Sequence, residues 1–139
     1  MRSSSLWSAS VAFVVLALTG SPHSLAAELR VPIDEPTIQS AIDAASPGDV
    51  ILVTADIYFE SIDFRGKEVT IRGEGEFPFD TVIDGSGAPK PVAQLIRGEG
   101  AGATLENLTL RGGTGRLKGG VSYGGGMVCR DASPTLRDV

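Results

Sequence analysis

The chain has 139 residues, enough for one domain, and carries 12 Lys and Arg against 17 Asp and Glu, a net charge of −5 at pH 7. The basic residues are scattered along the sequence, so no nucleic-acid surface and no surface for anionic membranes is indicated. A single cysteine excludes an internal disulfide framework.

Residues 1–27 have the organisation of a secretory signal peptide. Arg2 supplies the positive start, Leu6–Leu18 is an apolar run, and small residues such as Ala26 offer a cleavage site. A membrane anchor is disfavoured because a span needs about 20 apolar residues. We therefore expect a secreted or cell-envelope protein, extracellular or periplasmic, with no membrane span after cleavage.

Cleavage also removes two residue types from the mature chain. The single histidine, His23, and the single tryptophan, Trp7, both lie in the leader. The mature chain therefore cannot use a histidine base, a Ser/His or Cys/His nucleophile system or a His-ligated metal. It also lacks tryptophan as a stacking surface for sugars.

Residues 28–49 are expected to form an entry strand followed by a capping helix. Val31 and Ile33 share one face of the extended entry segment. Between 37 and 45 the apolar residues recur at helical spacing, which predicts a short amphipathic helix. Pro36 suits its first turn, and Asp34 and Glu35 suit its electropositive end. A helix this short needs an apolar surface to lie on.

Residues 50–139 contain only strand-like runs, and glycine turns follow nearly every one. The sequence predicts strands at 50–53, 61–64, 69–72, 82–84, 92–97, 103–111, 126–130 and 135–139.

A sandwich or barrel would also fit short strands with glycine turns, but an internal repeat favours a solenoid. Residues 71–75 (IRGEG) recur letter for letter at 96–100, and the same offset of 25 carries Ile83 onto Leu108. A fixed period in the twenties is typical of repeat architectures. The predicted fold class is all-β: a right-handed parallel β-helix solenoid, with the short N-terminal helix capping the open end of its core.

Several stretches resemble pectin-lyase-like right-handed β-helix proteins, and the resemblance covers nearly all of 33–139. It rests on residues 37–53, on Tyr58 and Glu60 in place of a G-x-Y-x-E motif, and on 67–73, 81–85, 105–110 and 123–129. The usual Pro-Gly before the tyrosine is replaced by Ala55-Asp56-Ile57, and residues 112–125 form an insertion expected to project as a loop.

The resemblance is specific for the fold and carries over no catalytic residue. Pectin methylesterases use paired aspartates, an arginine and glutamines on later coils, and no motif such as Y-Q-D-T-L occurs here. Pectate lyases use an acidic calcium cluster and an arginine base, which match no positions in this chain.

The repeat predicts that Arg72 stacks on Arg97 and Glu74 on Glu99. Such a charged ladder would make Glu74 and Glu99 candidate ligands for calcium, the one cofactor considered, or for sugar hydroxyls. A solvated charged face, in which each exposed pair contributes roughly 0–1 kcal/mol, is the favoured interpretation.

Asp80, Asp84 and Glu106 are the candidate carboxylates for acid–base catalysis, because glycoside hydrolysis uses two carboxyl groups close together. For Asp84, which precedes Gly85, a turn role is favoured. Cys129 is expected to be a small buried residue within its strand, rather than a reactive thiol.

The expected function is that of an exported surface module that binds a polysaccharide or an envelope protein, with no active site in this chain. The alternative is the N-terminal part of a polysaccharide lyase, pectin esterase or glycoside hydrolase with catalytic residues on later coils. The sequence stops inside a predicted strand with no polar cap, so we expect the coils to be incomplete at the C-terminus.

Overall fold

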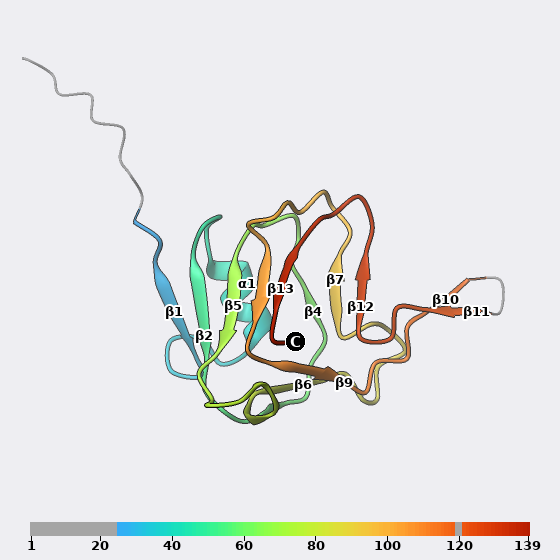
Figure 1. Cartoon of the computed structure of the whole chain (residues 1–139), viewed down its shortest axis with the longest axis horizontal. Helices are drawn as coiled ribbons and strands as arrows, with labels where there is room; N and C mark the ends of the chain where they lie inside the picture. The colour runs from blue at the N-terminus through green and yellow to red at the C-terminus, as the bar shows by residue number, and fades with distance from the viewer. Residues whose placement is uncertain (1–24, 119–120) are drawn as a thin grey trace, which may run out of the picture.

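The computed structural model describes residues 25–118 and 121–139, so most of the predicted signal peptide lies outside the described residues. Within them the chain is rich in strands, with one α-helix and one short 3-10 helix (Figure 1). The elements are β1 (Glu28–Val31), α1 (Ile38–Ala44), β2 (Val50–Val53), β3 (Ile57–Tyr58), β4 (Ile62–Asp63), β5 (Thr70–Gly73), η1 (Pro78–Asp80), β6 (Val82–Asp84), β7 (Ala93–Leu95), β8 (Thr104–Glu106), β9 (Thr109–Arg111), β10 (Arg116–Lys118), β11 (Val121–Tyr123), β12 (Met127–Cys129) and β13 (Thr135–Arg137).

Three parallel sheets make up the body of the molecule. Sheet A has the order β1-β2-β5-β8-β13, sheet B the order β3-β6-β9 and sheet C the order β4-β7-β12. From β2 onward the chain visits A, B and C in turn, and each visit adds a strand beside the previous one (Figure 1). The fold is therefore all-β with parallel sheets, an arrangement compatible with a parallel β-helix.

The core is built from apolar side chains stacked in register on neighbouring strands. In sheet A, Ile51 pairs with Ile71 and Ile71 with Leu105, and all three side chains are fully buried. Ile62 and Ala93 stack in the same way in sheet C. Such columns form because residues at the same register of parallel strands point to the same face.

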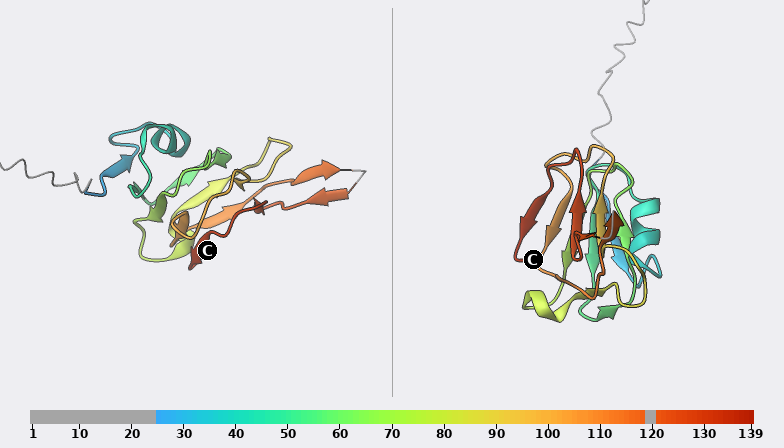
Figure 2. Two further views of the ribbon diagram at one scale, coloured as in Figure 1. Left: turned by 90° about the horizontal axis from the view of Figure 1, so that it is seen from above. Right: turned by 90° about the vertical axis from the view of Figure 1, so that its right-hand side faces the viewer.

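Helix α1 lies at the end of the stacked strands from which the chain enters (Figure 2). It buries Ile38, Ala41 and Ile42 against the core, which confirms the predicted amphipathic helix. No helix in the described ranges is long and apolar enough to cross a membrane.

The ends of α1 are held differently from the sequence-based expectation. Thr37 is the N-cap residue, so Pro36 precedes the helix, and the first turn contains no acidic residue. The carboxylate at the electropositive end is that of Glu60, which accepts 3.0 Å hydrogen bonds from the backbone N–H of Ile38 and of Gln39. Asp34 and Glu35 were wrongly assigned, because proximity in sequence to a helix start does not place a carboxylate at the free N–H groups.

The predicted register of the charged ladder is wrong. Arg72 pairs with Glu106 rather than stacking on Arg97, and Ile83 pairs with Leu110 rather than Leu108. The distance along the chain from one strand to the next of sheet A changes from 20 residues (Val50 to Thr70) to 34 (Thr70 to Thr104). Turn lengths vary while the core columns fix the pairing, so a constant period fails.

Two predicted extended segments are shorter than expected. The predicted strand 103–111 divides into β8 and β9, because Asn107 adopts a positive φ of 51° and turns the chain from sheet A to sheet B. The entry strand ends at Val31, so Ile33 does not share its buried face and is 72% exposed.

The insertion at 112–125 does project from the stacked strands, as predicted (Figure 2). It contains the antiparallel pair β10–β11, which the sequence analysis did not anticipate.

Candidate functional site

A polar pocket of about 370 Å³ opens where the segment after β3 meets the turn after β6. We call it the Asp84 pocket. Its lining residues are Phe59, Glu60, Ser61, Asp84, Gly85, Ser86, Gly87, Ala88 and Lys90.

Asp84 is held at the pocket by the turn that follows its strand. It is the last residue of β6, and its Oδ1 accepts a 2.9 Å hydrogen bond from the backbone N–H of Ser86. Its Oδ2 lies 2.7 Å from Nε of Arg111 on the neighbouring strand β9. The turn role expected for Asp84 is thus part of its geometry, together with an ion pair that crosses sheet B.

These contacts fix the charge of Asp84. Hydrogen bonds from Ser86, followed by the hydrogen bond and charge of Arg111, lower the pKa of the Asp84 carboxyl to about 2. The group is therefore ionised at neutral pH and accepts hydrogen bonds, so it is unsuited to act as a general acid there.

Ser61 contributes a hydroxyl with unused hydrogen-bonding capacity. Its Oγ is buried and has no hydrogen-bond partner within residues 25–118 and 121–139. A Cβ on Gly85 would come within 3.2 Å of this oxygen and 3.0 Å of Val92 Cγ2, so glycine keeps the space beside Ser61 open. Since an unsatisfied hydroxyl is costly, Ser61 gains from any ligand that bonds to it.

The margin of the pocket carries an aromatic ring and a cation. The Phe59 side chain is 74% exposed, and Lys90 is also exposed. Glu60 lines the pocket too, but both of its carboxylate oxygens are bonded to the start of α1. The groups presented to a ligand are therefore an apolar ring, an ammonium, hydroxyls and one ionised carboxylate.

The other two candidate carboxylates lie in different hydrogen-bonded settings. Asp80, in η1, accepts a 2.8 Å hydrogen bond from the N–H of Phe77. Glu106, in β8 of sheet A, forms a 3.1 Å ion pair with Arg72. No contact joins either of them to Asp84 within the described residues, so the structure does not bring the three candidates into one acid–base pair.

The two candidate metal ligands are also separately engaged. Glu74 lies 3.3 Å from Arg30, whereas Glu99 is 1% exposed and accepts hydrogen bonds from the N–H of Gly66 and of Arg97. Burial by itself raises the pKa of Glu99, but its backbone hydrogen bonds outweigh burial and lower it. The described part of the chain contains no group of three or more His, Cys, Asp or Glu arranged to hold a metal ion.

Cys129 lies in β12, inside the predicted strand, but its expected burial is wrong because the residue is exposed. Partial burial, then the charge of Glu99, raises the pKa of its thiol, so the thiolate is disfavoured.

Sequence reasoning identified Asp84 but missed Phe59, Ser61, Lys90 and Arg111. The first three lie in segments that the strand pattern treats as turns, and Arg111 belongs to the neighbouring strand. The one local signal is Asp84-Gly85-Ser86-Gly87, a turn whose glycines leave room beside it.

No protein-family model, no curated protein and no solved structure matches this chain.

Proposed function

We propose that this chain is part of an exported right-handed parallel β-helix that binds a glycan in the Asp84 pocket. The observation that carries the proposal is the combination in one pocket of an ionised carboxylate, a hydroxyl without a partner and an exposed aromatic ring.

The strand order supports the β-helix. Successive strands enter sheets A, B and C in turn, and each pairs in parallel with the strand laid down one circuit earlier. Each circuit buries its apolar side chains only by stacking on the next, as in other repeat proteins. The signal-peptide pattern of residues 1–27 supports export.

The chemistry of the pocket supports a sugar as the ligand. Sugar rings present hydroxyls around their edge and C–H groups on their faces. Asp84 and Ser61 offer hydrogen-bond partners for hydroxyls, and the exposed ring of Phe59 offers an apolar platform for a ring face. Lys90 adds a donor at the margin.

The pocket favours binding over catalysis by these residues. Asp84 is held ionised by its contacts, and Glu60 is committed to α1. The alternative, that the chain is the N-terminal part of a polysaccharide lyase, esterase or hydrolase, would place the acid–base groups elsewhere. That alternative rests on the resemblance of the sequence to pectin-lyase-like proteins.

The experiment is a glycan-array screen of the full chain after export, followed by titration calorimetry with the best oligosaccharide. We expect Phe59→Ala and Ser61→Ala each to weaken binding about tenfold, the loss expected for one buried contact. The matched control is Phe79→Ala, which removes an equally exposed ring outside the pocket.

Binding to no glycan, or equal losses in Phe59→Ala and Phe79→Ala, would contradict the glycan site. Release of new reducing ends from a bound polysaccharide would favour the enzyme alternative.

A further inference from the structure

A second surface exposes apolar side chains away from the Asp84 pocket. Ile57 is 42% exposed, Phe77 48% and Phe79 67%. The two phenylalanine rings are stacked, with centroids 5.2 Å apart and planes 9° apart. Ile57 pairs with Val82, which follows η1 closely, so these side chains lie around the same part of sheet B. None of them lines the Asp84 pocket.

The turns that carry these residues are joined to one another at one edge of the molecule. Parallel strands end at the same edge of a sheet, so the turns after β1, β2 and β5 meet there. Backbone hydrogen bonds link them: Thr54 N–H to the Val31 carbonyl, Glu74 N–H to the Val53 carbonyl, and Val82 N–H to the Asp56 carbonyl.

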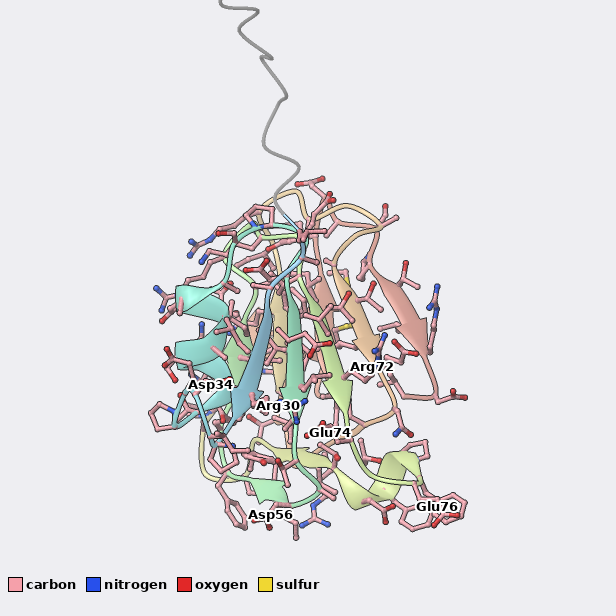
Figure 3. The ribbon with its side chains drawn as sticks, turned by 90° about the vertical axis from the view of Figure 1, so that its left-hand side faces the viewer. Arg30, Asp34, Asp56, Arg72, Glu74 and Glu76 are labelled. Atoms are coloured by element: carbon pink, nitrogen blue, oxygen red, sulfur yellow. The ribbon has the colours of Figure 1, made fainter. Side chains whose placement is uncertain are left out.

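This edge is strongly acidic. Asp34, Asp56 and Glu76 lie along it beyond the strands of sheet A, and Glu74 lies just inside it beside Arg30 (Figure 3). The sequence has no Lys or Arg between Arg30 and Arg65, and none between Arg72 and Lys90. Burial first, then the charges of Asp56, Glu60 and Glu74, raise the pKa of Tyr58, which is a sign of the negative potential there.

Exposed apolar rings surrounded by one sign of charge specify the chemistry of an occupant. Arginine and lysine are attracted to the faces of aromatic rings and to carboxylates, while their stems pack on apolar surface. A neutral or acidic partner would leave carboxylates facing no opposite charge.

We propose that Ile57, Phe77 and Phe79, together with Asp56 and Glu76, form a docking surface for a basic segment of another protein. The segment combines Lys or Arg with apolar residues, and it binds independently of any glycan in the Asp84 pocket.

The test uses the full exported chain and a fluorescein-labelled synthetic peptide of alternating lysine and leucine, with fluorescence anisotropy as the readout. Asp56→Asn/Glu76→Gln and Phe77→Ser/Phe79→Ser should each weaken binding about tenfold, the effect of losing one principal contact. The control pair Glu28→Gln/Asp131→Asn makes the same change in net charge away from this surface and should change affinity less than about twofold. Far-UV circular dichroism identifies variants that keep the native fold, and only these are compared.

A peptide with serine in place of leucine separates this surface from general charge attraction, and should bind about tenfold more weakly. The proposal is overturned if both carboxylate pairs cause the same loss, if the serine peptide binds equally well, or if neither peptide binds at low salt. It is also overturned if light scattering shows that Phe77 and Phe79 are instead covered in a dimer of this chain.

Discussion

Asp84 joins a turn, an inter-strand ion pair and the proposed glycan pocket through one carboxylate. Its hydrogen bonds to Ser86 and its pairing with Arg111 all require the ionised form. A residue that holds β6 to β9 in this way is useful to a ligand only because its remaining acceptor capacity faces the pocket.

The lowered pKa of Asp84 predicts a dependence of stability on acid. The folded pKa, about 2, lies below the ordinary value of 3.8, so the ionised carboxylate stabilises the folded state above pH 4. That contribution is lost as the pH falls from about 4 towards 2. In Asp84→Asn, the fall in melting temperature over this range should be smaller than in the wild type. An identical acid profile in the two proteins would contradict the prediction.

Helix α1 is stabilised at both ends by charged side chains that follow it in the sequence. Glu60 accepts from the N–H groups of its first residues, and Lys67 Nζ donates to the carbonyl oxygens of Ile42, Asp43 and Ala45 at 2.7–2.8 Å. A helix of seven residues has little stability of its own, so these contacts and its buried face hold it in place.

Lys67→Met keeps the apolar stem of Lys67 but removes the ammonium group that bonds three carbonyl oxygens. We expect the free energy of unfolding to fall by about 1–2 kcal/mol, because charged groups at helix ends contribute on this scale. Lys90→Met is the matched control on an exposed turn, with an expected change below about 0.5 kcal/mol. Urea denaturation measures both, and equal effects would contradict the role assigned to Lys67.

At this scale the sequence predicts an element well where one local pattern decides it. The apolar spacing of Ile38, Ala41 and Ile42 predicts α1, and the runs at 50–53 and 82–84 coincide with β2 and β6. The break at Asn107 was missed because an apolar pattern continues through it, while the backbone turns there. The two-residue strand β3 is too short to produce a periodic signal.

For the whole molecule, the parallel, strand-rich fold could be predicted from glycine-punctuated apolar runs, but the register could not. Register follows from the buried columns, such as Ile51, Ile71 and Leu105, and these depend on turn lengths that differ between circuits. The Asp84 pocket depends on the same register. Arg111 reaches Asp84 only because β9 pairs with β6 at a spacing of 27 residues. The site was therefore only partly predictable from sequence.

The central claim, that successive circuits stack with the register described above, is tested most directly by disulfide trapping. In a Cys129→Ala background, Thr70→Cys/Thr104→Cys places cysteines opposite each other on β5 and β8, within reach of a disulfide. Arg72→Cys/Arg97→Cys is the pair favoured by the constant repeat of 25 residues. We predict rapid intramolecular oxidation of the first pair and none of the second, measured by thiol alkylation and mass spectrometry. Oxidation of the second pair but not the first would contradict the stacking.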